Sequence, residues 1–346
     1  MTLAGGIDLA QVLRPCAPPV VLADVYTEAQ HRALLDVVKA NGPWATIIGQ
    51  HFETVDEMIA TQTGVVPEGH GLTLDHFTGP LFRGYLAQNS TVLYPELFDA
   101  FYNEKFLDLV KDYWGCPYAR PTMMLFNISG PHDSGGVPHL DAVTFRGVRI
   151  ENTPVWLQNV MAKSGLFTDH IIKMAQVVTW WWQGEEGTFT YWPDGPHEPP
   201  KRIEHPLWNK GVVVQNELMF HRGDSQGRPE ERTHKGVRAR SLFHHDADAD
   251  EWLVTTDGEV VLRFAPEQIR FLVHWNAELY ADEEELHKVM DHTDDLTHEQ
   301  VVDTLLADLV SRGVRVAEPS DPFHDVEWIQ ALMHTYTIAP TTDWPA

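Results

Sequence analysis

The stretch Thr122-Met-Met-Leu-Phe-Asn-Ile128 marks the point in the chain where the residue pattern becomes that of a β-protein. It is a short apolar run after Pro121, and similar runs recur downstream between turns rich in Gly and Pro. No regular alternation of strand and helix accompanies them, so the pattern favours a sandwich or barrel over a parallel α/β sheet. The further strands expected cover residues 139–148, 177–182, 188–192, 211–216 and 237–244, with a helix at 158–175.

Helices are predicted before this β-region. Thr27 can cap a helix, and apolar residues follow it at helical spacing. The elements expected here are a strand at 19–25 and helices at 27–40 and 98–114.

A hairpin and then helices are predicted after the β-region. Asp257-Gly258 suits a tight turn between strands at 252–256 and 259–264. Helix signals follow at 282–290 and 297–309, the second with a Thr297 and Gln300 capping box. The chain is therefore predicted to be mainly β with flanking helices. We divide it into a core with amino-terminal helices, 1–264, and a helical carboxy-terminal extension, 265–346.

Composition narrows the classes of function. The 346 residues carry 50 acidic against 25 basic side chains, a formal net charge of −25, which disfavours binding to nucleic acid or to anionic membranes. Cys16 and Cys116 are the only cysteines, so neither a disulfide framework nor a thiolate zinc site is predicted. No apolar run is long enough to span a membrane, and we expect a cytoplasmic protein. The sequence does not indicate an oligomeric state.

A His-x-Asp tripeptide at His139-Leu140-Asp141 is the first candidate for chemistry. In a strand the side chains at i and i+2 leave the same face, so His139 and Asp141 can point at one metal ion. Two further tripeptides, His244-His245-Asp246 and His292-Thr293-Asp294, lie in polar surroundings typical of the surface. His139 instead follows a Gly-Gly-Val-Pro turn at a strand entrance, although a histidine bonded only to its neighbouring aspartate is an alternative there.

His221 is the candidate third ligand. It ends the β-prone run Gly211-Val-Val-Val-Gln-Asn-Glu-Leu-Met-Phe-His221. Two histidines and one carboxylate on one face of an octahedron are the ligands of non-haem Fe(II) oxygenases, with positions left open for other ligands. The alternatives for the third ligand are histidines that no predicted strand delivers, namely His170, His197 and His205.

Two arginines share one face of the predicted strand at 237–244. Arg238 and Arg240 are costly in an otherwise apolar strand unless an anion meets them, and a guanidinium matches a carboxylate through two parallel hydrogen bonds. A small dicarboxylate is one such partner. An edge strand paired with the acidic surface is the alternative.

With these features in order, the chain resembles the Fe(II)- and 2-oxoglutarate-dependent dioxygenases of the phytanoyl-CoA hydroxylase-like group. The resemblance covers about residues 19–250 and rests on four features in sequence. These are the strand 123–129 before His-x-Asp, the Gly-rich strand and turn at 187–197, the Gly-led strand ending in His221, and Gly236-Val237-Arg238.

The resemblance implies a double-stranded β-helix core of the jelly-roll, cupin-like kind. It implies that His139, Asp141 and His221 bind iron and that Arg238 binds the far carboxylate of 2-oxoglutarate. Because 226–234 resembles an insertion, Arg240 and Arg232 are rivals for that role. Asn127, polar in an apolar strand, is a further candidate cosubstrate contact, although a buried Asn bonded to backbone is an equal alternative.

The implied reaction uses O2 and 2-oxoglutarate to oxidise a small organic substrate, by hydroxylation in the default case. The retained carboxylate of Asp141 argues against halogenation. Aromatic side chains from Trp180-Trp181-Trp182 and from Phe189, Tyr191 and Trp192 are expected mostly in the core, and any that line the cavity would suit a sizeable apolar or aromatic substrate. The low basic content favours a small amino-acid-derived or natural-product substrate over a coenzyme A thioester. The alternatives are a 2-oxoglutarate-independent metal oxygenase or hydrolase and a non-catalytic binding protein.

Overall fold

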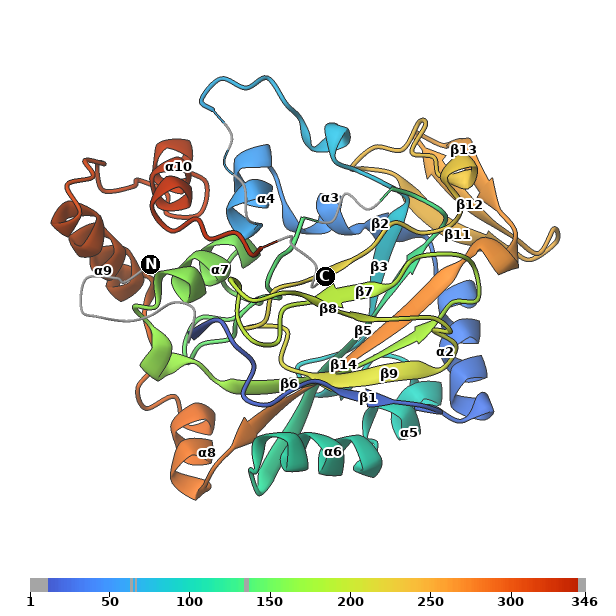
Figure 1. Ribbon diagram of the computed structural model, residues 1–346, viewed down its shortest axis with the longest axis horizontal. Helices are drawn as coiled ribbons and strands as arrows, with labels where there is room; N and C mark the ends of the chain where they lie inside the picture. The colour runs from blue at the N-terminus through green and yellow to red at the C-terminus, as the bar shows by residue number, and fades with distance from the viewer. Residues whose placement is uncertain (1–11, 63–64, 66, 134–136, 342–346) are drawn as a thin grey trace.

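The computed structural model describes residues 12–62, 65, 67–133 and 137–341 (Figure 1). Its strands form two antiparallel sheets, and the larger has the order β1-β9-β6-β14-β5-β3-β2-β11-β12-β13, with β4 paired to β3. These strands are β1 (Val20–Leu22), β2 (Trp44–Thr46), β3 (Leu81–Gln88), β4 (Thr91–Val92), β5 (Tyr118–Ser129), β6 (Lys173–Trp181), β9 (Lys210–Val214), β11 (Leu242–Asp246), β12 (Glu251–Thr256), β13 (Glu259–Phe264) and β14 (Arg270–Tyr280). The smaller sheet, β10-β7-β8, joins β7 (Phe189–Tyr191), β8 (Lys201–Ile203) and β10 (His221–Gly223).

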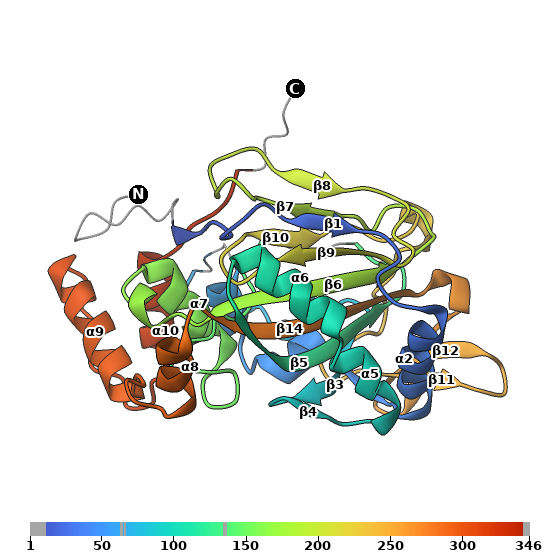
Figure 2. The ribbon, with the colours of Figure 1, turned by 90° about the horizontal axis from the view of Figure 1, so that it is seen from below.

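The two sheets face each other as a double-stranded β-helix. Figure 2 shows the small sheet layered over β6, β14 and β5. Leu272 of β14 and Val178 of β6 pack between the layers against Phe189 and Tyr191 of β7. Because directly paired residues of neighbouring strands point to the same face, these contacts identify the inner face of the large sheet. The fold is therefore mainly β, of the jelly-roll kind.

Helices cover the outer face of the large sheet and one end of the molecule. The helices are α2 (Glu28–Ala40), α3 (Ile47–His51), α4 (Val55–Thr61), α5 (Phe98–Phe101), α6 (Glu104–Trp114), α7 (Val155–Ser164), α8 (Glu283–Met290), α9 (His298–Ser311) and α10 (Val326–Thr335). Phe106 of α6 and Val38 of α2 pack with Phe126 and Trp275 on the outer face. Helices α4, α7, α9 and α10 form a second core at one end (Figure 1). Among the described helices, none has the length and apolar character needed to cross a membrane.

Several local predictions are confirmed. Helix α2 begins at the predicted cap, where Thr27 and Gln30 form a capping box. Helix α9 begins in the same way at Thr297 and Gln300. Asp257 and Gly258 join β12 to β13 with positive φ angles of 54° and 85°, as the tight hairpin turn requires.

Other predictions are wrong. Residues 139–148 form only isolated bridges, and the helix expected to reach residue 175 ends at Ser164, before β6 begins at Lys173. The strand expected at 237–244 begins only at Leu242, because Ser241 N donates to Arg238 O in a turn. Residues 265–346 are not wholly helical, since β14 lies between β5 and β6 in the large sheet. The run His274-Trp-Asn-Ala-Glu-Leu279 alternates polar and apolar residues, which is the period of a strand and a signal that sequence reasoning missed.

Candidate metal centre

His139 and His221 are held together by their backbones. His139 N donates to His221 O and His221 N donates to His139 O, each at 3.0 Å, so residue 139 pairs beside β10 although it belongs to no regular strand. Asp141 N donates to Asn216 O at 3.2 Å. All three candidate side chains are thus anchored to the segment that runs from the end of β9 to β10.

The two imidazoles present the same nitrogen to the centre. His139 Nδ1 lies 3.1 Å from Val137 O and His221 Nδ1 lies 3.0 Å from Met219 O. Because a carbonyl oxygen only accepts hydrogen bonds, each Nδ1 carries the proton and each Nε2 is left with a lone pair. A metal ligand requires that lone pair.

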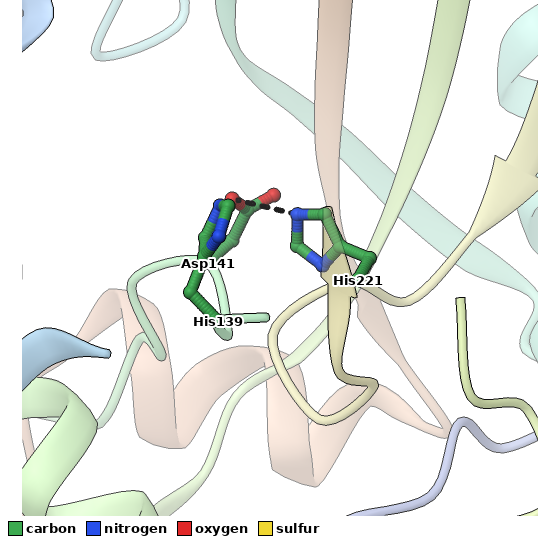
Figure 3. Close-up of side chains that lie close together, drawn as sticks. All are labelled: His139, Asp141 and His221. Carbon is green, nitrogen blue, oxygen red and sulfur yellow. Dashed lines mark ion pairs between the residues drawn. The ribbon is translucent and has the colours of Figure 1, made fainter. Parts of the chain in front are cut away.

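The three side chains converge on one point. One ligand atom from each of His139, Asp141 and His221 lies within 4.8 Å of the others, and His221 Nε2 is 3.5 Å from Asp141 Oδ1 (Figure 3). Within the described part of the chain this is the one group of three or more His, Cys, Asp or Glu side chains with such spacing. Two imidazoles and one carboxylate are a donor set that suits non-haem Fe(II).

The charges of the group also suit a metal. Burial and the neighbouring His221 lower the pKa of His139 to about 4, so this imidazole is neutral at physiological pH. Burial by itself would raise the pKa of Asp141, but the neighbouring histidines, His221 first among them, hold it well below its usual range. The centre therefore holds a neutral imidazole and an ionised carboxylate before any metal binds.

A buried amide supports the carboxylate. Gln176 Nε2 donates to Asp141 Oδ2 at 2.9 Å and to Glu217 Oε1 at 3.0 Å. Burial and the charge of Asp141 raise the pKa of Glu217 to about 8. Sequence reasoning missed both Gln176 and Glu217. A polar residue inside an apolar run, which drew attention to Asn127, could have indicated Gln176 as well.

The other histidines considered as ligands lie elsewhere. His170 ends a 3₁₀ turn at 168–170, and His197 and His205 are exposed in the segments around β8. His245, whose side chain is largely buried, pairs with Asp250, and the exposed His292 pairs with Asp295. None of these five belongs to the converging group.

The arginines considered for 2-oxoglutarate are engaged by acidic side chains away from the centre. Arg238 has an exposed fraction of 48% and lies 3.6 Å from Asp75. Arg240 is 60% exposed and donates twice to Asp257. Arg232 pairs with Asp133 and Glu186. Arg238 and Arg240 were predicted to share one face of a strand. They lie in a turn instead, so they have no common strand face.

A different pair of arginines lies on the inner face of the large sheet. Leu272 packs between the sheets and is the cross-strand partner of Asn127, whose other partner is Arg83. Arg270 lies two residues before Leu272 on β14 and therefore points to the same face. Asn127 touches Arg83, since its Oδ1 accepts from Arg83 Nε at 2.8 Å.

His274 is a further polar residue of the inner face that sequence reasoning missed. It pairs across the sheet with the inward-facing Val178. Burial lowers its pKa to about 4, while Asp141, Arg83, His221 and Arg270 act on it through their charges. His274 is therefore neutral, and it shares the inner face of the large sheet with Arg270.

Several solved structures resemble this chain at low identity. No protein-family model matches the sequence, and no curated protein matches it. A 2OG-Fe(II) oxygenase family oxidoreductase from Burkholderia pseudomallei is 11% identical, with a TM-score of 0.39 over 81% of this chain and 95% of its own. A prolyl hydroxylase from Trichoplax adhaerens, in complex with a hypoxia inducible factor peptide, is 8% identical, with a TM-score of 0.37 over 78% and 86%. HygX from Streptomyces hygroscopicus, with nickel and 2-oxoglutarate bound, is 8% identical, with a TM-score of 0.36 over 76% and 84%.

Proposed function

We propose that this protein is a non-haem Fe(II) oxygenase that uses 2-oxoglutarate as cosubstrate and O2 as oxidant to hydroxylate a small organic molecule. The observation that supports the proposal most strongly is the convergence of His139, Asp141 and His221 with both Nε2 atoms available. When bound there, iron and 2-oxoglutarate would supply the oxidising power needed to break a C–H bond. The order of motifs along the chain supports the finer placement in the phytanoyl-CoA hydroxylase-like group.

The chain's own residues have distinct roles in this proposal. His139, Asp141 and His221 hold the metal, and Gln176 fixes the orientation of Asp141 through its hydrogen bond. The inner face would enclose the reacting groups and exclude water, because apolar side chains from both sheets surround it.

Arg270 is the residue that we propose for the far carboxylate of 2-oxoglutarate, in place of Arg238. Its side chain is buried, with an exposed fraction of 8%, its Nε has no hydrogen-bond partner, and no carboxylate of the described residues forms an ion pair with it. Asp224, whose charge acts on Arg270, is already bonded to Thr188, Thr190 and Arg222. A buried guanidinium without a counter-ion is costly, and a carboxylate satisfies it through two parallel bonds.

The test is metal-dependent cosubstrate binding followed by turnover. Without O2, the parent protein loaded with Mn(II) is expected to bind 2-oxoglutarate, while metal-free protein and His139→Ala are not. With Fe(II) and O2, succinate should then form and increase with a substrate from a panel of small acids and natural products. Metal binding without 2-oxoglutarate binding would favour a 2-oxoglutarate-independent enzyme. Failure to bind metal at all would favour a non-catalytic protein.

A further inference from the structure

Arg83 is a second arginine shielded from solvent without a carboxylate partner. Acidic residues outnumber basic ones two to one, and ion pairs join most arginines of the described residues to carboxylates. Among those that lack an ion pair, Arg14, Arg32 and Arg315 are exposed, whereas Arg270 is buried and Arg83 half-buried. A guanidinium left unpaired in such an acidic chain requires an explanation.

Arg83 faces the interior that holds the metal centre. On β3 it is paired with Asn127 of β5, which is paired in turn with the inward-facing Leu272 of β14. Gln176 of β6 donates to Asp141 and lies two residues from the inward-facing Val178, so it points to the same face. Arg83 and the metal centre therefore lie over the same face of the large sheet.

Neutral partners hold the Arg83 side chain in place. Its Nε donates to Asn127 Oδ1 at 2.8 Å, and its Nη1 lies 3.2 Å from His51 Nε2. Burial and then the charge of Arg83 lower the pKa of His51 to about 3, so this imidazole is neutral and accepts the hydrogen bond. Asn127 and His51 thus orient the guanidinium without neutralising it, and further N–H donors are left for a ligand.

Arg83 and Arg270 can serve two different anionic groups. They lie on strands separated by β5 and two residues apart along the sheet, which sets their Cα atoms about 12 Å apart. A single 2-oxoglutarate that chelates the metal at one end has only one far carboxylate to offer. Arg270 is the more deeply buried of the two, whereas Arg83 lies beside α3 and is only half-buried.

We propose that Arg83 binds a carboxylate of the substrate, so that the enzyme acts on small carboxylic acids. This inference rests on the proposed function, because it assigns Arg270 to 2-oxoglutarate and leaves Arg83 for the molecule that is oxidised.

The test is a pair of calorimetric titrations on Mn(II)-loaded protein without O2. The first measures 2-oxoglutarate. The second, with 2-oxoglutarate saturating, measures carboxylates against their primary amides: benzoate and benzamide, phenylacetate and phenylacetamide, N-acetyl-leucine and N-acetyl-leucinamide. At least one acid is expected to bind about tenfold more tightly than its amide, the difference that a charge-assisted hydrogen bond provides. Arg83→Gln should lose this preference and keep 2-oxoglutarate binding, and Arg83→Lys should keep part of the preference.

Arg32→Gln is the matched control, since Arg32 is an exposed arginine on α2 without an ion pair. It should keep both the 2-oxoglutarate affinity and the preference for acids, and thermal unfolding should show that each variant is folded. The inference is overturned if no acid binds better than its amide, if Arg83→Gln keeps the preference, or if Arg83→Gln loses 2-oxoglutarate while Arg270→Gln keeps it. If the parent protein binds no 2-oxoglutarate in the first titration, that result contradicts the proposed function instead. The second titration is then run without 2-oxoglutarate and still measures whether acids bind through Arg83.

Discussion

His139 and His221 each donate a backbone hydrogen bond to the other's carbonyl at 3.0 Å, so the chain itself sets the spacing of the two imidazoles. Because these bonds do not involve the rings, His139→Ala and His221→Ala are expected to stay folded and to lose Mn(II) binding, as measured by calorimetry. His292→Ala alters an exposed histidine from another His-x-Asp tripeptide and should bind metal like the parent. Equal Mn(II) affinity in His139→Ala and the parent would show that the triad does not hold the metal.

The amide of Gln176 should strengthen metal binding although it is not a ligand. Gln176→Leu removes the donor to Asp141 Oδ2 and frees that carboxylate to rotate. The expected loss of Mn(II) affinity is about tenfold to a hundredfold, as for other residues that orient metal ligands. The control is Gln158→Leu in α7. It removes the hydrogen bond from another buried amide to Thr153 O and should leave the Mn(II) affinity unchanged. If both variants lose Mn(II) affinity equally, the loss comes from removing a buried amide in general and not from the contact of Gln176 with Asp141.

The assignment of the cosubstrate arginine can be decided by one comparison. Arg270→Gln is expected to lose about 1.5 to 3 kcal/mol of 2-oxoglutarate binding free energy, the value of a hydrogen bond to a charged group. Arg238→Gln should lose none, because Arg238 is half exposed and already pairs with Asp75. Titration of the Mn(II)-loaded variants measures both, and the opposite ranking would restore the assignment made from sequence.

The buried Lys163 should make the free energy of unfolding depend on pH. This lysine is buried in α7, where its Nζ donates to Ala60 O and Gln62 O, and burial lowers its pKa from 10.5 to about 7. Between these values the unfolded chain binds more protons than the folded one, so the free energy of unfolding should rise with pH over this window. In Lys163→Met, the free energy of unfolding measured with urea should rise less between pH 7 and 10.5 than in the parent.

The control for Lys163 is Lys105→Met, which replaces an exposed lysine of α6. It should keep the rise seen in the parent. A rise of equal size in Lys163→Met and the parent would show that another group causes the pH dependence.

Close packing around Gly84 on β3 leaves no room for a larger side chain. A Cβ at this position would lie 2.5 Å from ring atoms of both Phe126 and Trp44. Gly84→Ala is therefore expected to lower the free energy of unfolding by about 1 to 3 kcal/mol, as overpacking of a core does. At Gly79, just before the strand, the nearest atom would be 3.5 Å away in His132, so Gly79→Ala should cost less. Chemical denaturation of both variants measures the difference.

The sequence by itself determined the parts of this protein that depend on local interactions. The caps at Thr27 and Thr297 and the turn at Asp257 and Gly258 are written in side chains a few residues apart, and all three form as predicted. The β-class also follows from local patterns of apolar runs and turns. His139 and His221 could be singled out because each stands at the edge of such a run.

Only the tertiary structure decided which polar residues share the interior. Arg270 belongs to β14, a strand in a segment that was expected to be helical, and its pairing with β5 and β6 places it in the large sheet. Arg83 and Gln176 reach the same inner face through strand pairings that bring together distant parts of the chain. The surroundings of Arg238 are likewise set by tertiary structure, since residues 238–241 form a turn and Asp75 lies 3.6 Å from its side chain. Pairing between distant strands sets which side chains face inward, and no short segment of sequence contains that information.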